Sequence, residues 1–267
     1  MYYNVHMNIT IAGYGFVGKA IEAYLHEAGH TTHIVDPKYS NMSVLDTKSN
    51  GVIICVNTPA NTDGSCDMSN VIDVLEDTPS KVPVLIKSTI SIQGWETIFQ
   101  MFPSHAISFS PEFLRAETAI EDMLAADTVY IGGGDVYFWE KVLARKILDT
   151  SLFRRKHVTI KVAHPRDLIL AKYFRNSFLA TKVAFFNQVY DLCEAAGCEH
   201  KAVIPLITDD NRIGDSHSRV TSERGFGGHC FPKDTQAILK TAQDFEIDLS
   251  LIREAIHYNN NIRKGDT

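Results

Sequence analysis

Residues 225–234 read Gly-Phe-Gly-Gly-His-Cys-Phe-Pro-Lys-Asp and combine the residue types that covalent catalysis by a thiol requires. Three glycines allow the backbone to approach a ligand closely, and Cys230 follows them. Pro232 favours the first turn of a helix, so we expect Cys230 just before a helix N-terminus, where the helix dipole and Lys233 favour the thiolate. Asp234 follows one turn later and could hold a water molecule or a developing charge. The alternative is a glycine loop beside a buried, unreactive cysteine.

A second group, Gly13-Tyr14-Gly15-Phe16-Val17-Gly18, has the spacing of a dinucleotide-binding turn between a strand and a helix. Gly13 makes the tight turn, Gly15 leaves room for a pyrophosphate, and Gly18 lets the helix pack on the strand. The helix N-terminus, with Phe16 and Val17, faces the phosphates. Asp36 ends the next strand, where a carboxylate accepts ribose hydroxyls and repels a 2′-phosphate, so the sequence predicts NAD rather than NADP. A glycine turn without a ligand is the alternative.

The elements that position these residues alternate between strands and helices in the first half of the chain. The sequence predicts strands at 8–12, 31–35, 52–56, 82–87, 106–109, 129–131 and 157–162, and helices near 16–28, 68–77, 91–101 and 135–149. This alternation is typical of a doubly wound parallel sheet, in which the loops at the carboxyl ends of the strands bind ligands. Three such loops carry suggestive polar residues, at 57–59, 87–90 and 110–114.

The second half is predicted to be helical. Residues 166–196 contain neither proline nor glycine and predict one long helix, on which Lys172 and Asn176 share a face and Asn187 returns close to the same stripe. The residues around Lys172 and Asn176 on this helix are bulky and apolar. We therefore expect these two polar side chains to line a site and not to lie on a solvated surface. The predicted fold is therefore an α/β, Rossmann-like, doubly wound parallel sheet (residues 1–163), followed by an all-helical domain (164–267) that carries Cys230. The length of the helix also predicts a homodimer formed through it.

The overall composition excludes several classes of function. The formal net charge of −6 offers no electrostatic attraction to nucleic acid or to an anionic membrane, and no apolar run is long enough to span a bilayer. We therefore expect a cytoplasmic protein with neither partner. Five cysteines without a Cys-x-x-Cys pair argue against a disulfide framework or a thiolate zinc site, and Cys55 and Cys193 are expected to be inert. No metal is predicted.

The motifs of this sequence, in their order, resemble those of the UDP-glucose/GDP-mannose dehydrogenase family. The resemblance covers nearly the whole chain, and the glycine-cysteine motif is highly specific. The matching motifs are GYGFVG at 13–18, NTP at 57–59, KSTI at 87–90, SPEFLR at 110–115, KxxxN at 172–176, RIG at 212–214 and GFGGHCFPKD at 225–234.

The resemblance implies an NAD-dependent oxidation, with two NAD per turnover, of the primary alcohol of a nucleotide sugar of the UDP-glucose type to a carboxylate. It implies that Cys230 forms a thiohemiacetal and then a thioester, and that Lys172 and Asn176 stabilise the oxyanion. Lys172 and a water held by Asp234 lie around the sugar oxygen during the first oxidation. Glu112 acts as the base for hydrolysis, and Thr89 orders the polar network.

The resemblance also implies the binding residues. The expected sugar contacts are Phe113, Leu114, Lys172, Asn176 and Gly227, and Arg212 reaches a substrate in the partner subunit. The expected cofactor contacts are Gly13, Gly15, Phe16, Val17, Gly18, Asp36, Thr58, Thr89 and Lys233.

Two departures from the family pattern bear on activity. The family has an acid where this sequence has Ala116, and that acid helps to place the nicotinamide end of NAD. Family members also continue into a Rossmann-like domain that holds the uridine, whereas this sequence ends at Thr267, so we expect that domain to be lacking. One alternative is therefore a catalytically weak NAD-binding relic or subunit that needs a partner. Another is a two-electron 2-hydroxyacid-type dehydrogenase, whose chemistry has no use for the cysteine.

Overall fold

The computed structural model describes residues 6–144, 146–149, 154–228 and 230–263. The chain divides into a first unit, Met1–Pro59 with Cys66–Lys172, and a second unit, Ala60–Ser65 with Tyr173–Thr267. The elements are, in order, β1 (Asn8–Ala12), α1 (Phe16–Glu27), β2 (Thr31–Val35), β3 (Gly51–Ile54), α2 (Ser69–Glu76), β4 (Val84–Ile86), α3 (Ile92–Met101), β5 (Ile107–Phe109), α4 (Ala119–Ala125), β6 (Thr128–Gly133), α5 (Val136–Leu143), β7 (Lys146–Asp149), β8 (Arg154–His157), β9 (Thr159–Val162), α6 (Pro165–Ala196), α7 (His200–Thr208), α8 (Cys230–Asp244) and α9 (Ser250–Ile262), with short 3₁₀ turns at Leu45–Thr47 and Ala116–Thr118.

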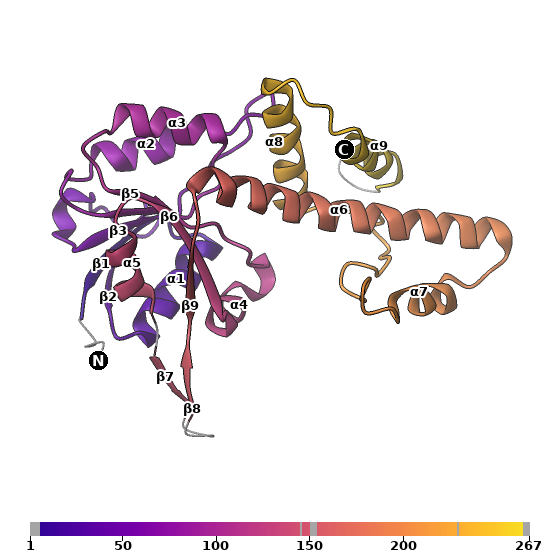
Figure 1. The fold of residues 1–267 in the computed structure, drawn as a ribbon, viewed down its shortest axis with the longest axis horizontal. Coiled ribbons are helices and arrows are strands. Elements are labelled where there is room, and N and C mark those ends of the chain that lie inside the picture. The colour runs from indigo at the N-terminus through magenta and orange to yellow at the C-terminus, as the bar shows by residue number, and fades with distance from the viewer. Residues whose placement is uncertain (1–5, 145, 150–153, 229, 264–267) are drawn as a thin grey trace. The chain divides into compact units, whose positions relative to one another are not determined.

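The first unit is built on a mainly parallel sheet whose described strands lie in the order β2-β1-β3-β4-β5-β6-β9. β3, β4 and β5 are buried along their whole length, as expected for parallel strands covered on both faces. Figure 1 shows α2 and α3 on the opposite face of the sheet from α1 and α4. Because β1 pairs with both β2 and β3, the strand order reverses there, and the crevice between β1 and β3 is where such sheets bind ligands.

The predicted Rossmann-like sheet is confirmed, with one difference in strand direction. β6 runs antiparallel to β5, and β9 is parallel to β6. The glycine run 132–134 permits this pairing, because a Cβ on Gly133 would lie 2.7 Å from Ile107 O and one on Gly134 would lie 2.6 Å from Ala106 C. The alternation of strands and helices does not encode the direction of an individual strand, so the sequence pattern missed the reversal.

The helix predicted near 135–149 is wrong in its second half. α5 ends at Leu143, and Ala144 leaves the helical conformation, with φ −71° and ψ 83°. β7 then pairs antiparallel with β8, in the register Lys146 to His157. The strand predicted at 157–162 accordingly divides between the end of β8 and β9. Pairing with the next strand, β8, satisfies the backbone groups of β7 and overrides the helical pattern.

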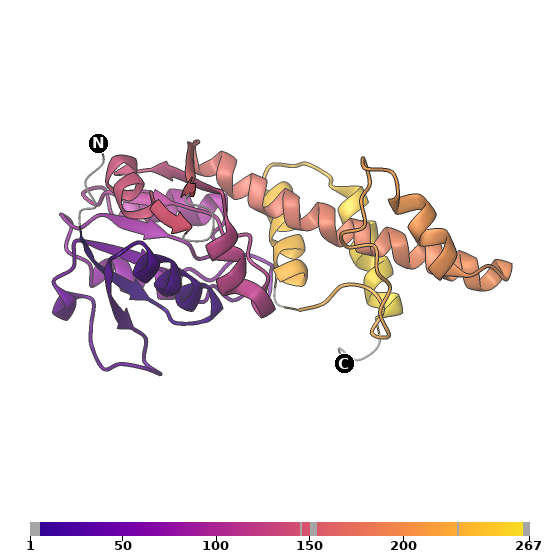
Figure 2. The ribbon, with the colours of Figure 1, turned by 90° about the horizontal axis from the view of Figure 1, so that it is seen from below.

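The second unit confirms the long helix. α6 spans Pro165–Ala196, beginning in the first unit and continuing through the second. Figures 1 and 2 both show α7 beside the C-terminal half of α6, with α8 and α9 crossing α6 closer to its middle. A small core joins Ala180 and Ala184 of α6 to Ile256 of α9 and to Phe226. Within the described residues, no helix is long and apolar enough to cross a membrane.

Candidate active site

In the glycine turn after β1, the fold requires two of the three glycines and leaves the third free for a ligand. Gly13 has φ +92°, and a Cβ there would lie 2.7 Å from the backbone of Cys55. A Cβ on Gly18 would lie 2.2 Å from Gly13 O, so both glycines are required by the packing of the chain itself. A Cβ on Gly15 meets no atom within 4 Å, and its φ of −74° suits any residue. The missing side chain of Gly15 therefore leaves room that a dinucleotide phosphate fits.

Asp36 ties the end of β2 to the same turn. Its Oδ2 accepts a hydrogen bond from Tyr14 N at 2.7 Å, and its Oδ1 accepts one from Lys38 N at 2.9 Å. The side chains of Phe16 and Val17, at the start of α1, pack against the core, which leaves their backbone to face a phosphate. Asp36 is thus placed at the carboxyl end of β2, as the prediction of a ribose-binding acid requires.

The loop after β3 contributes buried groups. Thr58 is 5% exposed. Burial raises the pKa of the Cys55 thiol to about 12, despite an opposing effect of Lys87, so this cysteine remains protonated. Its predicted inert role agrees with this environment.

A buried ion pair joins the ends of β4 and β5. Lys87 Nζ lies 3.0 Å from Glu112 Oε2 and donates to Ser110 Oγ at 3.1 Å, with the two charged side chains 2% and 10% exposed. Glu112 Oε1 also accepts a hydrogen bond from Phe113 N at 3.1 Å. Among the predicted site residues, Glu112 is therefore held in place by Lys87, which the sequence-based prediction omitted. The signal was present, because Lys87 and Glu112 follow neighbouring parallel strands whose carboxyl ends meet at one edge.

Lys172 and Thr89 meet in the first unit. Lys172 Nζ donates to Thr89 Oγ1 at 3.0 Å, and Lys172 is 7% exposed. An ammonium carries three donors, so the Lys172 side chain can donate to more than one oxygen. Asn176 lies one turn further along α6.

In the second unit the structure brings Asn176 and Asp234 together. Asn176 Nδ2 donates to Asp234 Oδ2 at 2.6 Å, and Asp234 is only 1% exposed. Asp234 Oδ1 lies 3.3 Å from Lys233 Nζ and accepts no hydrogen bond from the described residues. That oxygen can therefore accept a bound water.

Cys230 is the first residue of α8, so the helix begins two residues before Pro232. A proline is tolerated there because the first N–H groups of a helix have no partner within it. The half-buried thiol therefore lies at the helix N-terminus, where the helix dipole favours a thiolate.

Of the remaining predicted substrate residues, Phe113 and Leu114 lie in the first unit and Gly227 lies in the second. Phe113 stacks edge-on against Tyr130 with ring centroids 6.1 Å apart, and Leu114 packs on the core of the first unit. In the second unit, a Cβ on Gly227 would lie 2.2 Å from the guanidinium of Arg263.

Arg212 lies on an exposed turn of the second unit. The side-chain hydrogen bonds of Arg212 among the described residues all go to Asp210, and its side chain is 89% exposed. Lys182 Nζ anchors the turn to α6 by donating to Ile213 O at 2.7 Å and to Gly214 O at 2.9 Å. Within the part of the chain that the structure describes, no hydrogen bond or ion pair of Arg212 reaches another predicted site residue. Ala116 begins a short 3₁₀ turn and is exposed.

Comparison with known proteins gives a consistent family. The NAD binding domain of the UDP-glucose/GDP-mannose dehydrogenase family matches residues 38–145, and the central domain of the same family matches residues 169–261. A UDP-glucose 6-dehydrogenase of Bacillus subtilis is 29% identical over 96% of this chain and 66% of its own length. A UDP-glucose 6-dehydrogenase of Rickettsia typhi is 30% identical over 92% of this chain and 56% of its own length. The chain thus spans about two thirds or less of these two relatives.

The fold agrees with a solved structure. A UDP-glucose dehydrogenase from the archaeon Pyrobaculum islandicum superposes with a TM-score of 0.81 at 23% identity, over 97% of this chain and 69% of that one. The two family matches together cover most of the sequence, including Lys87, Glu112, Asn176 and Cys230. The chain therefore belongs to the UDP-glucose/GDP-mannose dehydrogenase family and carries its NAD-binding and central domains.

Proposed function

We propose that this protein oxidises the C6 primary alcohol of a nucleotide sugar of the UDP-glucose type to a carboxylate, with Cys230 as the covalent nucleophile. The observation that carries the proposal is the position of Cys230 as the first residue of α8, in the same unit as the buried Asn176–Asp234 pair. A simple alcohol dehydrogenase has no use for a thiol placed where a thiolate is favoured.

NAD, when bound, accepts a hydride from the sugar carbon in each of two oxidations. Gly15 would leave room for its pyrophosphate, the backbone at Phe16 and Val17 would face the phosphates, and Asp36 would accept hydrogen bonds from the ribose hydroxyls. Thr58, Thr89 and Lys233 are assigned to the cofactor by the family resemblance.

The residues of this chain have separate roles in the two oxidations. In the first, a water held by Asp234 accepts the hydroxyl proton while the Lys172 ammonium donates a hydrogen bond to the same oxygen, as the alcohol becomes an aldehyde. The Cys230 thiolate then adds to the aldehyde carbon, and Lys172 and Asn176 stabilise the oxyanion of the thiohemiacetal. Loss of a second hydride leaves a thioester, and collapse of the oxyanion forms its carbonyl group.

Glu112 completes the cycle by removing a proton from the water that attacks the thioester, which releases the carboxylate and returns the Cys230 thiol. Thr89 orders the polar network through Lys172. Phe113, Leu114 and Gly227 are assigned to the sugar, and Arg212 to the substrate of a partner subunit.

We also propose a homodimer formed through α6. Three phenylalanines of this helix remain largely exposed: Phe174 at 44%, Phe178 at 68% and Phe185 at 53%. Exposed aromatic side chains along one helix favour burial against a second copy. Light scattering at micromolar concentrations should report twice the monomer mass, and a clean monomer would refute the dimer.

A panel of UDP- and GDP-sugars with NAD tests the proposed activity. We expect NADH from UDP-glucose or a close relative, with two NADH formed per uronate. One NADH per sugar would indicate an ordinary two-electron dehydrogenase and would refute the covalent route. Absence of NADH with every sugar would refute the catalytic proposal.

A further inference from the structure

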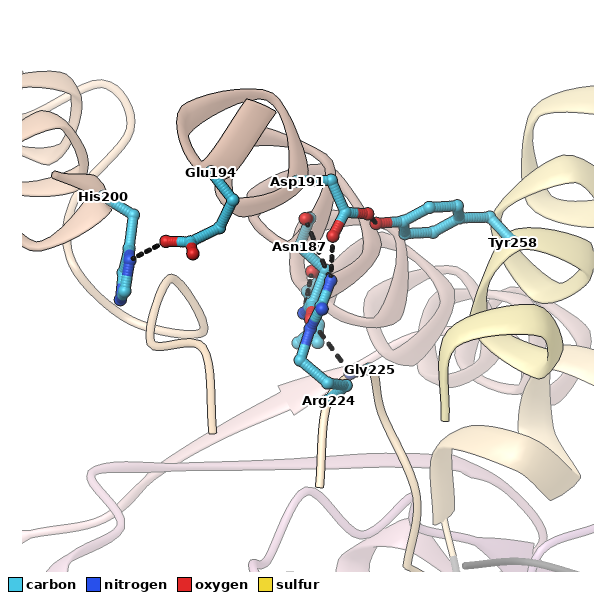
Figure 3. Close-up of polar contacts among 8 residues, drawn as sticks. Asn187, Asp191, Glu194, His200, Arg224, Gly225 and Tyr258 are labelled. Atoms are coloured by element: carbon cyan, nitrogen blue, oxygen red, sulfur yellow. Dashed lines mark hydrogen bonds and ion pairs between the residues drawn. The ribbon is translucent and has the colours of Figure 1, made fainter. Parts of the chain in front are cut away.

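Asn187 is a buried polar residue of α6 to which the proposed chemistry gives no role. It is 1% exposed. Its side-chain Oδ1 accepts two hydrogen bonds, from Arg224 Nε at 2.8 Å and from Gly225 N at 3.1 Å, and its Nδ2 donates to Val183 O at 2.9 Å. Figure 3 shows Asn187 and Asp191 of α6 on either side of the Arg224 guanidinium. The carboxamide oxygen thus has two partners, and both belong to the segment that leads to Cys230.

Arg224 adopts a backbone conformation that needs support. Its φ is +57°, in the left-handed region that non-glycine residues rarely occupy. Its guanidinium donates to Asp191 Oδ1 at 2.6 Å and to Asn187 O at 3.3 Å, and it lies 4.3 Å from the centroid of the Tyr190 ring. These contacts, with the Nε–H held by Asn187, over-determine the position of Arg224.

Asp191 extends the network to α9. Its Oδ2 accepts a hydrogen bond from Tyr258 OH at 2.5 Å, as Figure 3 shows. Burial alone would raise the pKa of Asp191, but the hydrogen bonds from Tyr258 and Arg224 outweigh burial and lower it. The carboxylate therefore stays charged and keeps Arg224 in place.

A second buried carboxamide holds the next residue of the loop. Asn259 of α9 accepts from Phe226 N at 2.6 Å and donates to Phe226 O at 3.0 Å, and it is 4% exposed. Gly225 has φ +55°, and a Cβ there would lie 2.2 Å from Asn259 Oδ1. Consecutive residues 225 and 226 are thus fixed by side chains from two helices, a few residues before α8 begins at Cys230.

We propose that Asn187 is a positioning residue for Cys230. Its carboxamide oxygen holds both the Arg224 side chain and the Gly225 amide, and so sets the path of the loop 225–228 that places Cys230 at the start of α8. The inference rests on the proposed function, because Cys230 needs a defined position only if it attacks a substrate. This role does not require Asn187 to contact Lys172, Glu112 or Cys230 directly.

The test compares Asn187→Leu, which removes the acceptor, with Asn187→Asp, which keeps an acceptor oxygen. In Asn187→Leu, loss of the two buried hydrogen bonds from Arg224 and Gly225 predicts faster hydrogen exchange of amides 225–228, by about tenfold or more. Iodoacetamide followed by peptide mapping should then label the half-buried Cys230 faster by about the same factor, since the loop that leads to it opens more often. Asn187→Asp should restore both rates to near the wild-type values.

Two controls separate positioning from a general loss of structure. Cys193 is 6% exposed and in the same unit, so its labelling in the same digest reports unfolding of that unit. Thr181→Val removes a comparable bond on α6, from Thr181 Oγ1 to Ser177 O at 2.8 Å, without touching the loop, and should leave Cys230 unchanged. In Asn187→Leu, faster labelling of Cys193 together with Cys230 would overturn the proposal, and so would an unchanged labelling rate of Cys230. The proposal would also be overturned if Asn187→Asp exchanged and labelled as fast as Asn187→Leu.

Turnover distinguishes this inference from the proposed function. With NAD and a nucleotide sugar, Asn187→Leu should lower kcat more than it raises KM for NAD, because the assigned NAD contacts other than Lys233 lie in the first unit. A wild-type protein that forms no NADH would refute the proposed function, while exchange and alkylation would still decide the role of Asn187. A variant with an unchanged kcat would overturn the positioning role.

Discussion

Lys87→Met breaks the buried ion pair between Lys87 and Glu112, the proposed base. Lys87 and Glu112 lie 3.0 Å apart with side chains 2% and 10% exposed, so the substitution leaves a buried carboxylate without its cation. Breaking such a pair by removing one partner costs about 3–5 kcal/mol. At about 3 °C per kcal/mol, the melting temperature should fall by about 10 °C. Ser110 Oγ also loses its ammonium donor, which adds to the loss.

Thermal unfolding of a matched set tests this magnitude. Arg166→Met removes a cation from the exposed Arg166–Glu96 pair, 3.5 Å apart and about half exposed, and should cost less than about 1 kcal/mol. The double variant Lys87→Met with Glu112→Gln should recover more than about 1 kcal/mol relative to the sum of the single changes, because the two sites are in contact. A Lys87→Met variant as stable as Arg166→Met, or additive single changes, would refute the reasoning.

Three further predictions concern the first unit. Gly15→Ala should change the free energy of unfolding by less than about 0.5 kcal/mol but weaken NAD binding in calorimetry. Gly18→Ala should lower the free energy of unfolding by about 2 kcal/mol, because its Cβ would lie 2.2 Å from Gly13 O. Equal losses of stability in the two variants would contradict this assignment. Calorimetry should show NAD bound more tightly than NADP, and Asp36→Asn, which keeps an acceptor but removes the charge, should narrow the difference; equal affinities in the wild type would contradict it. Because burial raises the Cys55 pKa to about 12, the unfolded thiol ionises first, so the free energy of unfolding should fall between about pH 9 and pH 12 by an amount that Cys55→Ala abolishes.

The βαβ unit and the long helix were predictable because their signals are local. The glycine spacing at 13–18 and the acid at Asp36 fix a strand, a turn and a helix within about thirty residues, and a sequence without proline or glycine predicts α6 directly. The end of α5 and the direction of β6 were not predictable in this way. Both depend on which strands pair, β6 with β5 and β7 with β8, and residue preferences do not report strand pairing.

In the candidate site, too, residues with a local sequence signal were predictable, and contacts that depend on the fold were not. Cys230, Asn176 and Asp234 were identified by residue type and motif, and the structure joins the last two by a hydrogen bond. Lys87 was given no role although its loop, 87–90, was singled out, because the sequence pattern does not show that it pairs with Glu112. Asn187 was noticed on the stripe of Lys172, but its contacts with Arg224 and Gly225 span 37 and 38 residues of sequence and become visible only in the fold.

The central claim, that Cys230 carries the second oxidation as a thioester, is tested by supplying the sugar aldehyde with NAD to the wild type and to Cys230→Ser. The first hydride transfer does not need the thiol, whereas the second requires a covalent thiohemiacetal that holds the aldehyde carbon in place. We therefore predict that the wild type forms NADH and the uronate from the aldehyde, and that Cys230→Ser forms neither while still interconverting alcohol and aldehyde slowly. A Cys230→Ser variant that makes the acid at the wild-type rate would contradict the account.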